Sequence, residues 1–220
     1  MPHSIIAIDG PAASGKSSVA RLLAQKLGFL FVSSGHFFRT IAWKAHHDQL
    51  DISDNTKVDD WLATFSLQSQ IIAGEIHLLI NGIDLTEYLK DSAVNRLVSP
   101  MAAIPSVRAF LLGQQRELAR HHNLVMEGRD IGSVVFPETS FKFYLDASLE
   151  ERARRRHCEG INDNISERDQ QDSARAIAPL LIAPGAIVID TTHLSIEEVV
   201  EEILRHVNAL LYNNEAVRSS

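Results

Sequence analysis

The chain has 220 residues, 45% of them hydrophobic, and a formal net charge of −7. This length and composition suffice for a full hydrophobic core and favour one domain with insertions over two. The negative charge argues against a protein that binds duplex nucleic acid, because such proteins usually carry a basic face.

The first predicted element is a buried strand followed by a glycine-rich loop. Residues 5–8 form a short apolar run, and the stretch after it matches the phosphate-binding pattern G-x-x-x-x-G-K-[ST] at every fixed position. Apolar residues then recur at helical spacing up to Leu27, so the loop opens onto a helix N-terminus, where the dipole favours an anion. The alternative is a glycine-rich strand–helix turn that binds nothing, and the register of strand, loop and helix disfavours it.

Each fixed position of this loop suits phosphate chemistry. Gly10 and Gly15 let the backbone turn so that successive N–H groups face phosphate oxygens. Lys16 adds a mobile charge for the β- and γ-phosphates, and Ser17 offers a hydroxyl to Mg²⁺. The predicted nucleotide-phosphate site comprises Gly10, Pro11, Ala12, Ala13, Ser14, Gly15, Lys16, Ser17 and Ser18.

A second strand is predicted over residues 29–32, followed by a turn at 33–35 and a helix over 36–46. Arg39 lies one helical turn beyond the strand end, where an α/β sheet directs side chains into its ligand crevice. Arg39 is therefore a candidate phosphate clamp, and a solvated surface arginine is the alternative. The acidic stretch over 48–60 is predicted to be a loop.

Between residues 67 and 85 the pattern changes to β. Ile76, Leu78 and Ile80 alternate with less apolar residues, and Asn81-Gly82 is a strong hairpin signal. We expect a small antiparallel insertion that is separate from the parallel core. Helical spacing returns over residues 94–101, and after a break at Pro105 another helix begins.

A third core strand is predicted over residues 124–126, and a fourth over 141–145. The third ends in Glu127-Gly128-Arg129-Asp130, which places two carboxylates and an arginine where the crevice of the sheet would take its polar groups. A tight turn with a surface ion pair is the alternative explanation of this motif.

The helix predicted over residues 150–156 is strongly basic, with Arg152, Arg154, Arg155 and Arg156. Such a run is most often a solvated helix face, but beside a phosphate site it also suits a lid that closes cations over the transferring phosphoryl group.

Arg168, Asp172 and Arg175 follow at helical spacings of i, i+4 and i+7, so they face one way, although a salt-bridge ladder would look the same. A fifth strand over 187–189 and an amphipathic helix that begins at the capping box of Ser195 and Glu198 complete the pattern. The chain from about residue 213 is expected to be disordered.

Strands that alternate with helices predict an α/β fold, namely a doubly wound, mostly parallel five-stranded sheet with the phosphate loop after the first strand. The single cysteine, Cys158, excludes an intrachain disulfide and suits a reducing compartment. There is no signal-peptide pattern, and no stretch approaches the ~20 apolar residues of a membrane span. We therefore expect a soluble, cytoplasmic protein without a membrane or nucleic-acid partner.

Together these motifs resemble those of the bacterial cytidylate kinases, which act on CMP and dCMP. The resemblance runs from about Ile5 to Leu211. The phosphate loop is shared by many families, but the other blocks, in this order and with a β-rich insertion before Pro105, are far more specific. The blocks are Ile8-Asp9-Gly10-Pro11 through Gly15-Lys16-Ser17, Ser34-Gly35 with Phe38-Arg39, Gly128-Arg129-Asp130 with Gly132 and Val134-Val135-Phe136-Pro137, Leu145-Asp146-Ala147-Ser148, and Glu167-Arg168-Asp169 with Asp172, Arg175 and Pro179-Leu180.

The resemblance implies ATP with Mg²⁺ as the donor, CMP or dCMP as the acceptor, and a catalytic set of Lys16, Arg129, Arg168 and Asp130. Ser34, Arg39 and Arg129 would hold the acceptor phosphate. Ser99, Arg108, Asp130 and Arg175 would read the cytosine, and Arg168 and Asp172 would hold the pentose. Independently of the family, the exocyclic amine of cytosine needs an acceptor such as a carboxylate, while its carbonyl and ring nitrogen need donors such as arginine.

The resemblance also implies an architecture. One kinase domain would span residues 1–214, with an enlarged monophosphate-binding part over about 64–98 and a lid over about 150–168 that carries Arg152, Arg155 and Arg156. The residues from 215 to 220 would form a disordered tail, and the protein would be a monomer.

This sequence departs from the family pattern at several places. Ser33 and Glu127 stand where aspartate is usual, Phe38 replaces a common tyrosine, and the segment between Arg156 and Glu167 is short. These departures bear on rate and substrate preference more than on the reaction.

Two other hypotheses remain. Another small-molecule P-loop kinase, acting on UMP, AMP or shikimate, would have the same donor site without a preference for CMP. A non-catalytic ATP sensor would bind nucleotide without acceptor-dependent release of ADP. The clustered arginines disfavour the sensor, which needs no second phosphate clamp.

Overall fold

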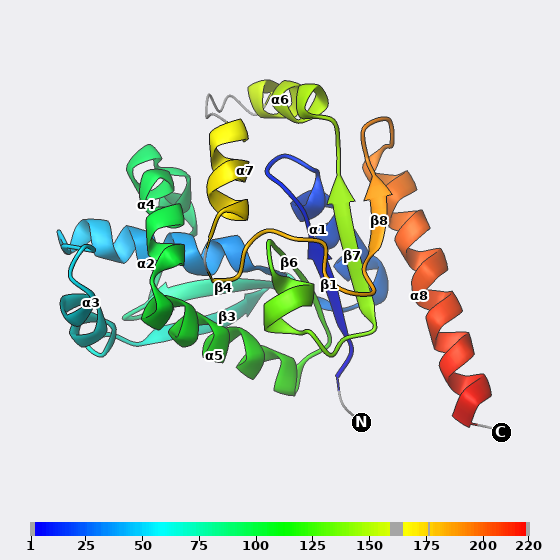
Figure 1. Ribbon diagram of the computed structural model, residues 1–220. Coiled ribbons are helices and arrows are strands. Elements are labelled where there is room, and N and C mark those ends of the chain that lie inside the picture. Colours follow the sequence, from blue (N-terminus) through cyan, green and yellow to red (C-terminus); the bar gives the residue numbers. More distant parts are fainter. Residues whose placement is uncertain (1–2, 159–164, 176, 219–220) are drawn as a thin grey trace.

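The computed structural model describes residues 3–158, 165–175 and 177–218 (Figure 1). Its centre is a parallel sheet whose strands are connected by helices, as the alternating pattern predicted. The parallel strands lie in the order β2 (Leu30–Ser33), β6 (Leu124–Gly128), β1 (Ile5–Asp9), β7 (Phe141–Asp146) and β8 (Ile187–Asp190). This order places β1 and the loop after it in the middle of the sheet.

Helices cover both faces of the sheet, because side chains alternate along each strand. On one face Ile6, Ile8 and Phe143 pack under α1 (Lys16–Leu27) and α8 (Ile196–Arg218). On the opposite face Ala7, Val32 and Met126 belong to a second cluster, which also contains residues of α2 (Ser34–His47), α4 (Ser92–Ala103) and α5 (Pro105–His121).

The antiparallel insertion extends the main sheet, so the expectation that it is separate was wrong. It consists of β3 (Leu67–Ile72), β4 (Glu75–Ile80) and β5 (Ile83–Asp84). The Phe31 N–H of β2 donates to the Gly74 carbonyl at 2.9 Å, and β4 continues beside β2 in parallel at Phe31 and Glu75. The pairing follows from the cost of leaving an edge strand with open backbone groups.

Two local predictions in this half of the chain also need correction. The expected turn at 33–35 is the start of α2, because Ser34 and Gly35 already have helical backbone. The expected acidic loop over 48–60 contains the helix α3 (Asn55–Leu62), which begins where the Asp54 carboxylate accepts from the backbone N–H groups of Thr56 and Lys57. A 3₁₀ turn, η1 (Thr86–Lys90), leads from the hairpin into α4.

The second half contains a single π-helical turn, η2 (Ile131–Val135), directly after β6; the sequence pattern did not predict it. The basic helix α6 (Leu149–Cys158) and the following α7 (Ile165–Ser173) lie above the carboxyl ends of the central strands (Figure 1). The part of the expected lid at 159–164 lies outside the described residues. The helix α8 continues to Arg218, beyond the point where disorder was expected, since its polar last turns still consist mostly of residues that tolerate a helix.

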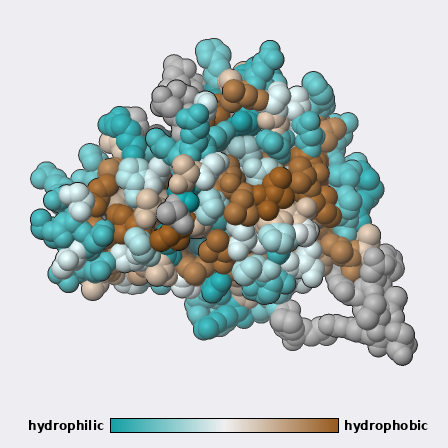
Figure 2. Space-filling view, in the orientation of Figure 1, coloured by the Kyte–Doolittle hydropathy of each residue, from teal (hydrophilic) through white to brown (hydrophobic). Residues whose placement is uncertain are grey.

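Figure 2 shows an apolar band across the middle of one face, over the chain that leads into β8. The exposed Ile177, Leu181, Ile182 and Val188 belong to this segment. Within the described residues, no helix combines the length and the apolar character that crossing a bilayer requires.

Candidate active site

The loop between β1 and α1 has the backbone that a phosphate cradle requires. A Cβ at Gly10 would lie 2.1 Å from the carbonyl oxygen of Leu145 on β7, so only glycine fits there. Gly15, the N-cap of α1, has a φ of +85°, in the left-handed region that glycine adopts without strain. The first turn of α1 therefore presents its N–H groups at the end of the sheet.

The side chains of this loop fit a phosphate ligand and its metal ion. The Lys16 ammonium donates to the Pro11 carbonyl at 2.8 Å and lies over the loop. The Ser14 hydroxyl is buried and has no hydrogen-bond partner among the described residues. Ser17 and Ser18 are exposed on the first turn of α1, so the Ser17 hydroxyl is accessible to a metal ion bound with the phosphates.

Two arginines of α6 face this loop. Arg152 donates to the Ala12 carbonyl at 3.2 Å and is paired with Asp169 of α7, whose carboxylate also accepts from the Ala12 N–H at 3.2 Å. Arg155 donates to the Ala13 carbonyl at 3.5 Å.

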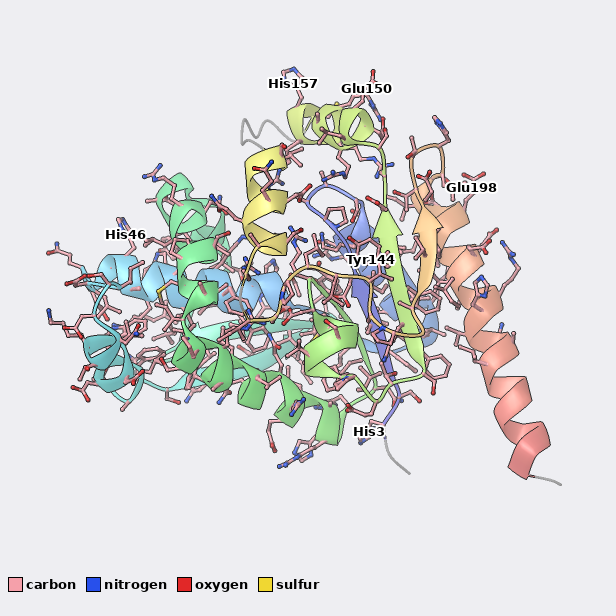
Figure 3. All side chains as sticks on the ribbon, viewed as in Figure 1. His3, His46, Tyr144, Glu150, His157 and Glu198 are labelled. Atoms are coloured by element: carbon pink, nitrogen blue, oxygen red, sulfur yellow. The ribbon has the colours of Figure 1, made fainter. Side chains whose placement is uncertain are left out.

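The remaining face of α6 is directed away from the loop. Arg154 is largely exposed and is paired with Glu151, whereas Arg156 is half-buried. Glu150 and His157 of the same helix point away from the body of the molecule (Figure 3). In the basic run, Arg152 and Arg155 thus contact the phosphate loop, whereas Arg154 lies largely in solvent.

Arg129 connects the phosphate loop to α7. Its Nη1 donates to the Gly10 carbonyl at 2.8 Å, and its Nε donates to Asp172 at 2.7 Å. The other oxygen of Asp172 is paired with Arg175. The motif after β6 and the motif on α7, which are far apart in sequence, therefore meet at one point beside the loop.

A cavity of about 220 Å³ lies between α5 and η2, next to Asp130. Its polar groups are Arg108, Asp130 and Gln115, and Arg108 and Asp130 form a buried ion pair. The remaining lining is apolar and comprises Phe38, Pro105, Ala109, Leu111, Leu112, Val134, Val135 and Ile177. Apolar side chains thus form most of the cavity wall, and Arg108 and Asp130 add a charged donor and a charged acceptor. Such a lining suits a planar ring with polar groups at its edge.

The comparisons with known proteins agree with one another. A model of the family described as cytidylate kinase matches residues 6–209. The chain is 41% identical over 209 residues to the cytidylate kinase of Caldanaerobacter subterraneus subsp. tengcongensis, covering 90% of this chain and 92% of that protein. It is also 41% identical over 214 residues to the cytidylate kinase of Geobacillus kaustophilus, covering 92% of this chain and 96% of that protein. The chain belongs to the cytidylate kinase family.

Membership of the cytidylate kinase family makes the chain an ATP-dependent phosphotransferase of the nucleoside monophosphate kinase class. The positions that the family pattern indicated can now be placed in space. Arg129, Asp172 and Arg175 form one connected set beside the phosphate loop, and the ion pair of Arg108 with Asp130 adjoins it, because Asp130 directly follows Arg129. The Nε of Arg175 is buried without a partner in the described part of the chain, so this set retains a donor for a ligand.

Four further positions were predicted to belong to the site. Ser34 is buried at the start of α2 and accepts from Gln115 at 3.0 Å. Arg39 lies on α2 near Asn95 of α4, with 3.4 Å between its Nε and the amide oxygen. Ser99 is half-buried on α4. Arg168 lies on α7, but its side chain is outside the described residues.

Two carboxylates of the cytidylate kinase site belong to predicted sequence motifs but were assigned no functional role from the sequence. Asp9, the last residue of β1, accepts from the N–H groups of Ile131 and Gly132 at 2.7 Å each and so caps the π-helical turn η2. Burial raises the pKa of Asp9 from 3.8 to about 7, although the two backbone hydrogen bonds oppose the shift. Its place directly before Gly10 was the only available sequence signal.

The second of these carboxylates is Glu127 at the end of β6, which the sequence motif had placed among the polar groups of the crevice without giving it a role. It is buried and accepts a short hydrogen bond from the hydroxyl of Ser33, its register partner on β2. Burial on its own would raise the pKa of Glu127. The charge of Lys16 and the hydrogen bond from Ser33 outweigh burial and hold the pKa below its ordinary value. The two departures from the family pattern, Ser33 and Glu127, are thus a single bonded pair with one negative charge.

Proposed function

We propose that the protein transfers the γ-phosphoryl group of ATP to CMP and dCMP, giving ADP together with CDP or dCDP. The observation that supports this proposal is the position of Arg129, which bonds the Gly10 carbonyl of the donor loop and the Asp172 carboxylate of α7 and directly precedes Asp130 of the cavity. A guanidinium at this junction would lie between the two phosphates that must meet.

The donor triphosphate would be held by residues 10–18. Their N–H groups would surround the phosphates, and Lys16 would neutralise charge on the β- and γ-phosphates. Ser17 would hold Mg²⁺, which when bound shields the same phosphate oxygens from one another.

The cavity would hold the base of the acceptor. An ionised Asp130 accepts a hydrogen bond from the exocyclic amine of cytosine, whereas the carbonyl that uracil carries at the same position offers only lone pairs. Arg108 and Arg175, together with the hydroxyl of Ser99, would complete the polar edge of the base. Preference for cytosine over uracil then follows from Asp130, because uracil would place a carbonyl oxygen against this carboxylate, and two acceptors with no hydrogen between them repel each other.

Arginines around the cavity would hold the rest of the acceptor. Arg39 and Arg129, with Ser34, would hold its phosphate. Asp172 and Arg168 would hold the pentose. Arg152, Arg155 and Arg156 belong to the lid that would exclude water from the donor phosphates.

The transfer requires no general base. An oxygen of the acceptor phosphate, already anionic near neutral pH, forms a bond to the γ-phosphorus, while the bond from that phosphorus to the bridging oxygen of ADP breaks. Lys16, Arg129 and Arg168 would stabilise the charge that builds up between them. An arginine in such a transition state is worth roughly 10³–10⁵ in rate.

The test is the formation of ADP from Mg²⁺-ATP with CMP, dCMP, UMP, AMP or no acceptor. We expect fast turnover that is largely confined to CMP and dCMP. ADP formation that is indifferent to the acceptor, or that is fastest with AMP, would contradict the proposal. If UMP supported ADP formation as fast as CMP does, the kinase activity would stand and only the role given to Asp130 would be contradicted.

A further inference from the structure

Thr191, which follows β8 directly, is a buried residue that neither the sequence motifs nor the family comparison singles out. Its side chain is only 3% exposed, although it follows an edge strand of the sheet. It lies where three segments converge, namely the phosphate loop, the end of β7 and the lid helix α6.

The hydroxyl of Thr191 has a partner in each of these segments. Its Oγ1 lies 3.1 Å from the Ser14 carbonyl oxygen and 3.0 Å from that of Asp146, and it accepts from Arg155 Nη1 at 3.1 Å. A hydroxyl has one hydrogen to donate. Because the Asp146 carbonyl already accepts the Thr191 N–H at 2.7 Å, the Ser14 carbonyl is the acceptor that gains most from this hydrogen.

The contact with Ser14 completes a series along the phosphate loop. Arg152 donates to the carbonyl of Ala12 at 3.2 Å, Arg155 to that of Ala13 at 3.5 Å, and Thr191 to that of Ser14 at 3.1 Å. Three consecutive carbonyl groups of the loop are therefore held from the same side of the site. The anchoring groups come from α6 and from the end of β8.

This series determines where the N–H groups of the loop point. In a trans peptide the carbonyl of one residue and the N–H of the next are directed oppositely in one rigid plane. Holding the Ser14 carbonyl therefore fixes the direction of the Gly15 N–H. Gly15 needs such a restraint, because a glycine at a φ of +85° has the widest choice of alternative backbone conformations.

We propose that Thr191 is a positioning residue of the donor site, whose hydroxyl aims the Gly15 N–H at the phosphates of ATP by holding the Ser14–Gly15 peptide. The proposal rests on the proposed donor role of the loop. Thr191 touches no reacting atom. It adds to the two arginines of α6 a restraint that comes from the end of β8.

The test compares Thr191→Val, which removes the hydroxyl at nearly constant volume, with Thr191→Ser, which keeps it. For Thr191→Val we expect KM for Mg²⁺-ATP to rise roughly 5- to 20-fold, the effect of about one buried hydrogen bond, with KM for CMP unchanged. Thr191→Ser should stay within about twofold of the parent. Thr192→Val is the matched control, since the Thr192 hydroxyl accepts from the Ser148 N–H and bonds Asp190, with no contact to the loop.

Inhibition by inorganic tripolyphosphate, which has no adenosine, gives the second readout. If Thr191 acts on the loop, the inhibition constant should rise in Thr191→Val by about the same factor as KM for ATP. An unchanged inhibition constant would overturn the proposal, as would equal damage in Thr191→Ser or an equal rise in both KM values. A parent enzyme that makes no ADP would instead contradict the proposed function, so the two failures are distinguishable.

Discussion

The contacts of Arg129 support the crevice position that its sequence motif suggested. The guanidinium bonds a backbone carbonyl of the donor loop at 2.8 Å and a buried carboxylate of α7 at 2.7 Å. A surface ion pair in a tight turn, the alternative explanation of the motif, would be mostly solvated and of little energetic value. Because Arg129 contacts the donor loop, while Asp172 has a second partner in Arg175, the loss of Arg129 should affect catalysis more than folding.

We predict that Arg129→Ala lowers kcat by about 10³-fold or more, because it removes a charge that stabilises the transition state. The fold should persist, since Asp172 keeps its ion pair with Arg175. Initial-rate measurements together with a thermal melt check both statements. Arg120→Ala is the control, because Arg120 is exposed and is paired only with Glu117 in the described structure; an Arg129 variant as active as that control would exclude the catalytic role.

The pair of Ser33 and Glu127 shows what residue patterns cannot reveal. Considered separately, Ser33 lacks the carboxylate that is usual at its position, and Glu127 has a side chain longer than the usual aspartate. The register of β2 against β6 places the two side chains opposite each other, where one hydrogen bond replaces the repulsion between two buried carboxylates. That register was not predicted, so the compensation was invisible in the sequence.

At the scale of elements, prediction succeeded where a local signal marks a boundary. The Asn81-Gly82 turn has φ values of +53° and +80°, as a tight hairpin requires. The capping box also formed, with Ser195 and Glu198 bonding each other's backbone N–H groups at 2.7 and 3.2 Å. The π-helical turn η2 has no such signal, because its cap is Asp9, which lies 122 residues earlier in the chain.

The helix α3 was missed although its cap is local. The acidic composition of the stretch favoured a loop, while the buried Val58, Trp61 and Leu62 lie on one side of a helix that packs into the larger core cluster. The same sequence therefore carried both an amphipathic signal and a solvent-like composition. Packing decided between them, as it commonly does for helices this short.

We predict that Asp54→Ala lowers the thermal midpoint by roughly 2–4 °C, because two backbone N–H groups of α3 lose their acceptor. Asp54→Asn keeps an acceptor oxygen and should lose much less. Asp59→Ala, an exposed substitution on the same helix, is the control. Identical melts for Asp54→Ala and Asp59→Ala would show that the cap does not stabilise the helix.

For the molecule as a whole, the fold could be predicted from alternating strands and helices and from one loop motif. The juxtaposition of β6 and β1 could not, because strand order depends on packing between segments more than 100 residues apart. That juxtaposition brings the Asp9 carboxylate under η2 and so connects the donor loop to the turn after Asp130. The two halves of the site are therefore connected through one buried carboxyl group.

Asp9 should make the global stability depend on pH. Its folded pKa of about 7 lies above the unfolded value of 3.8, so the folded state binds the extra proton between these values. The resulting stabilisation is complete below the unfolded pKa and is lost as the pH rises through about 7. Between pH 5 and pH 7 the parent should lose roughly 2 kcal/mol of unfolding free energy relative to Asp9→Asn, which cannot titrate there. Urea denaturation at several pH values measures this difference, with the exposed Asp59→Asn as a control.

Parallel stability profiles for the parent and Asp9→Asn would contradict the prediction. They would show that Asp9 is already ionised throughout this pH range, and its charge would then be stabilised by the two backbone N–H groups of η2.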